Sequence, residues 1–124
     1  MRILVIDDDE QMRVLLRQVM EWSGYTVIDA ENGRKGMQKQ REEPVDLVIT
    51  DLIMPEQEGL ETITTLKREF PEVKIVAISG GGRIGPEAYL PAAQELGADL
   101  VFSKPFDVKE FVTAVRGLLD HDQT

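Results

Sequence analysis

Five short apolar runs recur along the chain, and a longer polar or amphipathic stretch separates each run from the next. Short apolar runs bounded by turn residues are typical of strands buried inside a protein. The strands predicted in this way are Ile3–Ile6, Tyr25–Ile28, Asp46–Thr50, Lys74–Ile78 and Asp99–Phe102.

The stretches between these strands carry apolar residues at helical spacing. After Glu10, apolar side chains recur at steps of three and four up to Trp22, and Gly24 ends this first helix. We expect Trp22 to lie in the core or to be half-buried. Four further helices are predicted at Arg34–Glu42, Leu60–Phe70, Pro91–Leu96 and Val108–Leu119.

Strands that alternate with helices predict a parallel sheet with helices on both faces. Because crossover connections between parallel strands are right-handed, the expected result is a doubly wound α/β fold of five strands and five helices. The sequence has no internal repeat, no low-complexity segment and no break in composition. We therefore expect one domain over residues 1–124, with the final DHDQT as a short frayed tail.

Composition narrows the class of protein. Of the 124 residues, 42% are apolar and 30% are charged, as in ordinary globular domains. The formal net charge of −9 argues against nucleic-acid binding, which needs clustered lysine and arginine. No apolar run reaches the length of a membrane span, and the first residues are too acidic for a signal peptide. We expect a cytoplasmic protein that contacts neither nucleic acid nor membrane.

Several common kinds of chemistry are excluded. The sequence has no cysteine, so it has no disulfide, no thiol nucleophile and no zinc–thiolate site. Its one histidine, His121, lies in the polar tail, which leaves no nucleophile–histidine pair for acyl transfer. The two common glycine-rich phosphate-binding motifs are also absent from the sequence.

Polar residues follow the predicted strands at their carboxyl ends, where open parallel sheets bind ligands. These residues are Asp7, Asp8 and Asp9 after the first strand, Asp51 after the third, Ser79 after the fourth, and Ser103 and Lys104 after the fifth. Carboxylate oxygens suit Mg²⁺, which keeps several waters and can also bind phosphate oxygens. Such a site with a lysine nearby is equipped to handle a phosphoryl group, and a carboxylate can itself become an aspartyl phosphate.

The acidic run after the first strand could form a solvated turn, a helix cap or a cation site. Mutual repulsion between Asp7 and Asp8 would favour a bound positive charge there. We assign Asp9 and Glu10 to the start of the first helix, where negative charge meets the helix dipole favourably. Asp51 taken alone could simply be a turn residue at the end of a strand.

Four segments, in this order and spacing, resemble the receiver domain of two-component response regulators: ILVIDDD, DLVITDLIMPEQEGLE, AISG and VFSKPF. The resemblance covers essentially the whole chain, and it implies a flavodoxin-like fold with strand order 2-1-3-4-5. It implies either a stand-alone receiver similar to the chemotaxis regulators or a receiver cut from a longer regulator or hybrid kinase.

The resemblance implies roles for the acidic residues. Asp51 matches the phosphoacceptor of the family. Asp7 and Asp8 match the acidic pair that holds Mg²⁺ together with Asp51, with Asp8 as the direct ligand and Asp7 acting partly through water. The backbone carbonyl of Ile53 matches the remaining protein ligand of the metal.

The resemblance also implies a switch. Ser79 matches the hydroxyl that bonds a phosphoryl oxygen after phosphorylation, and Lys104 matches the lysine that pairs with the phosphoryl group. Pro105 is expected to follow that lysine in a cis peptide bond. Phe102 matches the aromatic residue that turns inward when the switch hydroxyl moves, although a buried aromatic on a strand is also ordinary core.

The function implied is that of a phosphoacceptor switch in a histidine–aspartate phosphorelay, rather than a turnover enzyme. A sensor histidine kinase or a histidine phosphotransfer protein would donate to Asp51 in the presence of Mg²⁺. Phosphorylation would then change the surface formed by the fourth helix, fifth strand and fifth helix. That surface would bind a downstream protein partner or form a homodimer.

Two other functions stay open at this point. One is a Mg²⁺-dependent phosphohydrolase with an aspartyl nucleophile, for which Asp7-x-Asp9 supplies the spacing. The other is a degenerate receiver that binds a partner without taking phosphate.

The stretch SGGGRIGPEAYLP departs from the family pattern by its richness in glycine and proline. We expect the helix after it to begin near Leu90 or Pro91, because proline is tolerated in the first turn of a helix. We also expect residues 80–90 to be disordered without phosphorylation, and Gly81 to leave room near the phosphoryl group.

Overall fold

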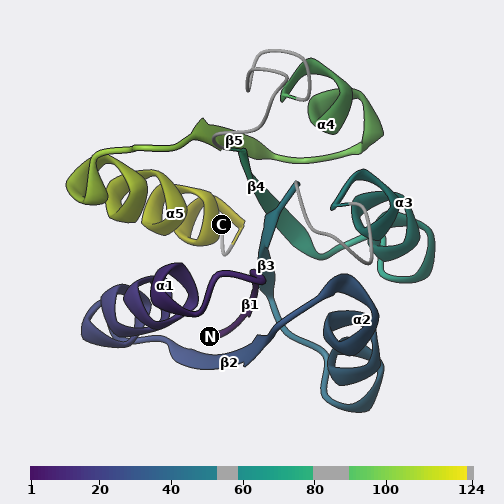
Figure 1. Ribbon diagram of the computed structural model, residues 1–124, viewed down its shortest axis with the longest axis horizontal. Helices are drawn as coiled ribbons and strands as arrows, with labels where there is room; N and C mark the ends of the chain where they lie inside the picture. Colours follow the sequence, from purple (N-terminus) through teal and green to yellow (C-terminus); the bar gives the residue numbers. More distant parts are fainter. Residues whose placement is uncertain (53–58, 80–89, 123–124) are drawn as a thin grey trace.

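Five parallel strands form one sheet in the order β2-β1-β3-β4-β5, which is the predicted order (Figure 1). The computed structural model describes residues 1–52, 59–79 and 90–122. The strands are β1 (Arg2–Ile6), β2 (Thr26–Ala30), β3 (Leu47–Asp51), β4 (Lys74–Ser79) and β5 (Leu100–Ser103).

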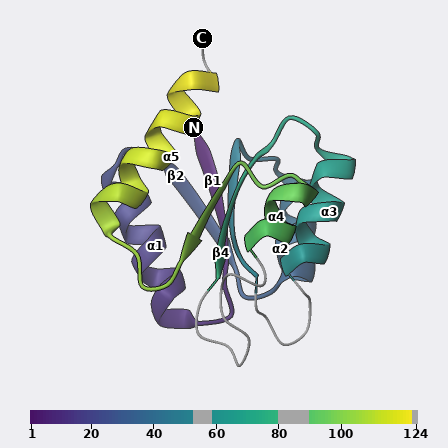
Figure 2. The same ribbon diagram turned by 90° about the horizontal axis from the view of Figure 1, so that it is seen from above.

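Helices cover both faces of the sheet, as Figures 1 and 2 show. The helices are α1 (Glu10–Trp22), α2 (Gly33–Glu42), α3 (Gly59–Glu69), α4 (Leu90–Leu96) and α5 (Val108–Asp122). Helices α1 and α5 lie on one face, and α2, α3 and α4 lie on the other. The predicted doubly wound α/β fold is therefore confirmed, and α4 begins at Leu90 as expected.

The core consists of two apolar layers, one on each face of the sheet. Alternate residues of a strand point to opposite faces, so Leu4 and Ile6 of β1 pack in the layer under α2, α3 and α4. Ile3 and Val5 pack in the layer under α1 and α5. All four side chains are fully buried. This double burial explains why the strand is an unbroken apolar run.

The start of α1 confirms that Asp9 and Glu10 belong to the helix. The side chain of Asp9 accepts hydrogen bonds from the backbone N–H groups of Gln11 and Met12, at 3.0 and 3.4 Å. It is thus the N-cap of α1, and Glu10 lies in the first turn. At the other end, Gly24 has a φ of +99°, the left-handed conformation that commonly ends a helix.

Trp22 is 83% exposed, so the prediction that it lies in the core or is half-buried is wrong. The residues of α1 that are buried are Leu16, Val19 and Met20. A step of three residues along a helix falls about 60° short of a full turn. The step from Val19 to Trp22 therefore carries the ring off the buried face.

Strands β3, β4 and β5 each end one residue later than predicted, and helix α5 ends later than predicted. Strand β3 runs one residue further than predicted, so Asp51 is its last residue rather than the first residue after it. Helix α5 continues to Asp122, so the prediction of a frayed tail is wrong for Asp120, His121 and Asp122, which are helical.

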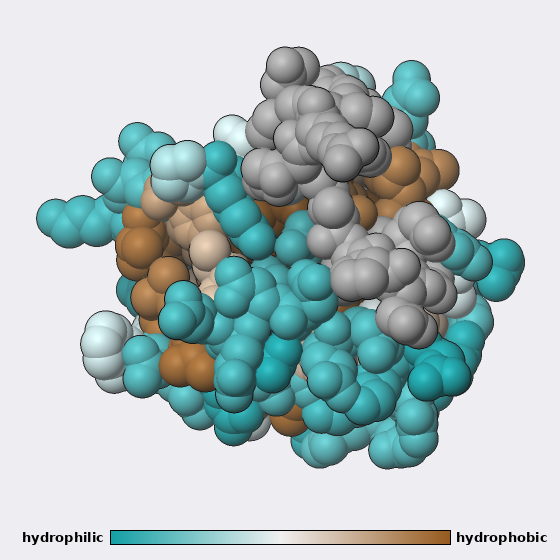
Figure 3. Space-filling view, viewed as in Figure 1, coloured by the Kyte–Doolittle hydropathy of each residue, from teal (hydrophilic) through white to brown (hydrophobic). Residues whose placement is uncertain are grey.

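Hydrophilic side chains cover much of the face seen in Figure 3, and hydrophobic ones gather along the edge that carries α1 and α5. Val14 and Leu15 of α1 are 47% and 40% exposed. Among the described residues, no helix has both the length and the apolar character that a membrane crossing requires.

Candidate metal and phosphoacceptor site

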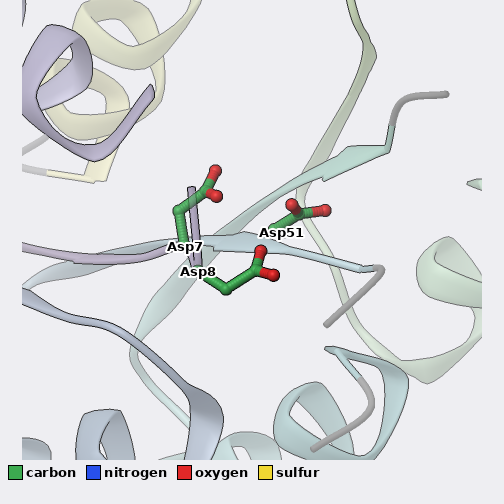
Figure 4. A group of neighbouring side chains, drawn as sticks. All are labelled: Asp7, Asp8 and Asp51. Carbon is green, nitrogen blue, oxygen red and sulfur yellow. The ribbon is translucent and has the colours of Figure 1, made fainter. Parts of the chain in front are cut away.

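Two adjacent strands bring three carboxylates together at one end of the sheet. Strands β1 and β3 pair in parallel, with Ile6 opposite Thr50. The next residues along the two strands, Asp7 and Asp51, therefore emerge side by side, and Asp8 follows directly. Figure 4 shows the three side chains gathered at this edge.

The three carboxylates are close enough to share one cation. One oxygen from each of Asp7, Asp8 and Asp51 lies within 4.8 Å of the others. Ligands on opposite sides of a Mg²⁺ ion are about 4.2 Å apart, since each bond is about 2.1 Å. Asp7 and Asp51 are buried, whereas Asp8 is exposed. The donor set, all hard oxygen ligands with one side open to water, fits Mg²⁺.

Lys104 reaches the same carboxylates from the end of β5. Its Nζ lies 3.4 Å from Oδ2 of Asp7 and 3.3 Å from Oδ2 of Asp51. Its backbone N–H donates to the carbonyl oxygen of Ser79 at 2.8 Å, which ties the residue to β4. The structure thus brings together Asp7, Asp8, Asp51 and Lys104, four of the predicted site residues.

Among the described residues, the negative charges of this cluster outnumber the positive charge of Lys104. Burial raises the pKa of the Asp7 carboxyl from 3.8 to about 6. A hydrogen bond from the backbone of Asp9 opposes that rise, the charge of Asp51 adds to it, and the charge of Lys104 opposes it. Burial lowers the pKa of Lys104, but the carboxylates of Asp51 and Asp7 raise it by more, so that it lies above its ordinary value. The lysine is therefore charged, and it faces more negative charge than it can offset.

The turn that carries Asp7 and Asp8 is held from two sides. The backbone N–H of Asp9 donates to Oδ1 of Asp7 at 2.9 Å. Nη1 of Arg13 donates to the backbone carbonyl oxygen of Asp7 at 2.8 Å. Arg13 was not among the residues predicted for the site. The only signal for it in the sequence is its place one helical turn after the N-cap residue Asp9, which is weak.

Ser79 is the last residue of β4, next to the strand that carries Asp51. The register pairs Asp51 with Ile78, so Ser79 is one residue further along the neighbouring strand. The side chain is fully buried, and its Oγ has no hydrogen-bond partner among the described residues. A buried hydroxyl without a partner is costly, and a phosphoryl oxygen on Asp51 is one group that could bond it.

Phe102 belongs to a cluster of three aromatic rings. Its ring centroid lies 5.0 Å from that of Phe111 and 6.0 Å from that of Phe106. The side chain is half-buried and packs against the apolar layer under α1 and α5. The Lys104–Pro105 peptide bond is cis. The predictions for Ile53, Gly81 and the disorder of residues 80–90 concern positions outside the described residues, apart from Leu90.

Comparison with known proteins shows to which protein family the chain belongs. The family model described as "Response regulator receiver domain" matches residues 3–116 of the chain. The chain belongs to the response regulator receiver domain family. Two-component response regulators are thus its relatives, as the four sequence segments suggested, and phosphoacceptor signalling is the function of the family.

Individual relatives agree with this assignment. The receiver domain is 32% identical to the response regulator receiver protein CpdR of Brucella abortus, over 95% of this chain and 96% of that protein. It is 33% identical to the chemotaxis protein CheY of Thermotoga maritima, over 92% of this chain and 93% of that protein. Other curated relatives are longer, and the chain spans about half of their length.

A solved structure shows the same fold. The crystal structure of a CheY-like receiver domain protein from Methanospirillum hungatei JF-1 aligns with a TM-score of 0.90 at 25% sequence identity. The alignment covers 98% of this chain and 95% of that one. Receiver domains act as phosphoacceptor switches rather than as classical enzymes, and they interact with histidine kinases or phosphotransfer proteins and with downstream targets.

Proposed function

We propose that Asp51 is the phosphoacceptor of this receiver domain. The observation that carries the proposal is the convergence of Asp7, Asp8 and Lys104 on the carboxylate of Asp51, which is only 6% exposed. A buried carboxylate flanked by a cation and by further oxygen ligands is suited to gain a phosphoryl group, because both added charge and added oxygens find partners.

The transfer forms one bond and breaks one. A carboxylate oxygen of Asp51 attacks the phosphorus of a phosphohistidine on a sensor kinase or a phosphotransfer protein. The new P–O bond gives an acyl phosphate, while the P–N bond breaks and its electron pair stays with the imidazole. The ammonium of Lys104 offsets the charge on the phosphoryl oxygens. Later attack by water returns Asp51 and inorganic phosphate, which is a slow self-dephosphorylation.

Asp7, Asp8 and Asp51 would hold Mg²⁺, and the backbone carbonyl of Ile53 would add a ligand from outside the described residues. When bound, Mg²⁺ supplies further positive charge beside the transferring group. Its binding also favours the ionised form of Asp7, whose pKa is raised in the metal-free protein.

The change caused by phosphorylation would pass from Asp51 through the ends of β4 and β5 to the surface of the domain. The hydroxyl of Ser79, which has no hydrogen-bond partner in the described part of the chain, can donate to a phosphoryl oxygen and would move toward Asp51. Phe102 would then change its packing, and the surface of α4, β5 and α5 would change with it. We propose that this surface binds a downstream protein or a second copy, and that residues 1–124 act as a single receiver domain in the cytoplasm.

The two alternative functions have less support. A phosphohydrolase would use Asp9 as an acid–base group, yet the Asp9 side chain accepts hydrogen bonds from two backbone N–H groups of α1. A degenerate receiver would lack part of the site, whereas this chain has Lys104 within 3.4 Å of two of its carboxylates.

Acetyl phosphate with Mg²⁺ distinguishes the three functions when intact mass and free phosphate are followed together. We expect one added phosphoryl group per chain. EDTA added before acetyl phosphate should prevent this addition, and the Asp51→Asn variant should not gain the group. Asp46→Asn, a change in an acid at the opposite end of β3, is the matched control and should be labelled like the wild type. Rapid release of many phosphates per chain, without accumulation of the singly phosphorylated mass, would indicate a hydrolase. No adduct would indicate a binding module.

A further inference from the structure

Arg13 connects the acidic turn to a second, separate ion pair. Its Nη1 donates to the backbone carbonyl oxygen of Asp7 at 2.8 Å, and its Nε lies 3.3 Å from Oδ2 of Asp29 on β2. The side chain is only 18% exposed. One guanidinium group thus spans from β2 to the turn after β1, with each end on a different partner.

The carbonyl that Arg13 holds belongs to the peptide bond between Asp7 and Asp8. A peptide unit is planar and rigid, so fixing its oxygen also fixes the nitrogen and the Cα of the residue that follows. Asp8 is exposed, and among the residues that the structure describes no hydrogen bond or ion pair holds its side chain. The position of the Asp8 carboxylate therefore depends on how firmly the peptide unit before it is held.

The contact with Asp29 keeps the guanidinium in place. Asp29 also lies 3.5 Å from Nη1 of Arg17, one turn further along α1. Arg17 shares the carboxylate of Asp29 with Arg13, and its other ion pair is with Glu21. The two arginines share a charge, a helix and a partner, and within the described part of the chain only Arg13 of the two has a bond to the acidic turn.

We propose that Arg13 is a positioning residue that holds the Asp7–Asp8 peptide unit so that the Asp8 carboxylate faces the cation site. This rests on the proposed function, because it presumes that the site takes Mg²⁺. Arg13 touches neither the phosphoryl group nor the metal in this role. It acts through the backbone of Asp7, as partners behind a metal ligand commonly do.

Two roles of Arg13 predict opposite effects of its replacement on Mg²⁺ affinity, one through its charge and one through its contact with the turn. A guanidinium close to the site repels a divalent cation, so removing the charge alone would strengthen Mg²⁺ binding. Removing a positioning contact weakens it, typically by about 10–100-fold in metal affinity. Lysine keeps the charge, but it lacks the planar fork that reaches two partners at once. The direction of the change therefore separates the two roles.

The experiment compares Arg13→Met, Arg13→Lys and Arg17→Met. Mg²⁺ affinity is measured by calorimetric titration, and the amide resonance of Asp8 is followed by NMR in the metal-free protein. Thermal unfolding of each variant establishes that it is folded at the temperature of measurement. If Arg13→Met does not fold, Arg13→Lys alone carries the test.

We expect both Arg13 variants to bind Mg²⁺ about tenfold more weakly than the wild type. We also expect the Asp8 amide resonance to move in both before any metal is added, and Arg17→Met to match the wild type in both measurements. Wild-type affinity in Arg13→Lys, or tighter binding in Arg13→Met with the Asp8 resonance unmoved, would overturn the proposal. Absence of Mg²⁺ binding in the wild type would instead refute the proposed function, and the metal-free resonance would still test the role of Arg13.

Discussion

Two clusters of charged side chains lie at the carboxyl ends of neighbouring strands, and they are built differently. At the end of β2, Asp29 faces both Arg13 and Arg17, and Glu31 pairs with Lys35. Each acid in this cluster has its own cation, and the cluster is partly or fully open to water. Such ion pairs contribute little to stability.

At the ends of β1 and β3 the balance is reversed. Within residues 1–52, 59–79 and 90–122, Lys104 is the cation that contacts Asp7 and Asp51, Asp8 lies beside them, and two of the three acids are buried. Three negative charges against one positive charge are costly to bury. The comparison teaches that the excess of negative charge among the described residues, rather than the number of charged groups, is what makes the cluster at β1 and β3 suited to a cation.

The largest expected difference between the two clusters is a pH dependence of the unfolding free energy, which Asp7 causes. Its pKa is raised from 3.8 to about 6 in the folded protein. Between pH 3.8 and about pH 6, the Asp7 carboxyl is protonated in the folded chain and ionised in the unfolded chain. The stability this proton provides is therefore complete below about pH 4 and is lost as the pH rises through 6, by about 3 kcal/mol in all.

Asp7→Asn should remove that loss, because asparagine has no charge to bury. We expect the variant to be up to about 3 kcal/mol more stable than the wild type at pH 8 in EDTA, and equal to it near pH 4. Urea unfolding at a series of pH values measures the difference. Added Mg²⁺ should stabilise the wild type more than the variant, and a pH-independent difference would contradict this account.

Removing the one cation of the unbalanced cluster should have the next largest effect. Loss of one partner from a buried pair is strongly destabilising. Because water reaches Lys104, which is 21% exposed, we expect Lys104→Met to lower the unfolding free energy by about 2 kcal/mol at pH 8 without metal. Added Mg²⁺ should restore more stability to the variant than it gives to the wild type. Arg17→Met, in the balanced cluster, serves as the control and should show no such restoration.

The smallest expected effect concerns Asp9, which lies beside the site in sequence but serves the helix. Asp9→Ala removes the N-cap of α1 and should lower the unfolding free energy by about 1 kcal/mol. Mg²⁺ affinity should be unchanged, because the bond from the Asp9 backbone to Asp7 remains. Glu31→Gln, in the balanced cluster, should change neither stability nor affinity measurably. Loss of Mg²⁺ binding in Asp9→Ala would mean that the acidic run is one feature rather than two.

The sequence predicted the location of the site well because strand ends are easy to find in this fold. Buried parallel strands are unbroken apolar runs, so the first polar residue after each run marks the edge of the sheet. That reasoning, with the family resemblance, found Asp7, Asp8, Asp51 and Lys104, which the structure brings together. It also separated Asp9 from them, because helix N-caps have their own pattern.

The features that the sequence did not predict depend on the direction in which a side chain leaves its helix and on which neighbouring element it reaches. Trp22 was misplaced because steps of three residues drift around a helix, and the pattern alone does not say which side the drift exposes. Arg13 was missed because its contact with the turn crosses from one element to another. The end of β3 was placed one residue early because Asp51, a charged residue, remains within the hydrogen-bonded strand.

The connection between β1, β3 and β5 sets the order in which the site can form during folding. Lys104 lies 97 residues after Asp7, and Asp51 lies between them on the strand that pairs with β1. The cluster therefore exists only once both ends of the chain have joined the sheet. The three carboxylates proposed to hold Mg²⁺ come from β1 and β3 alone, so they can meet before β5 brings Lys104, and Mg²⁺ bound at that stage would stabilise the incomplete sheet as well as the native one. The concentration of Mg²⁺ would then affect the rate at which the receiver folds as well as the lifetime of its folded state.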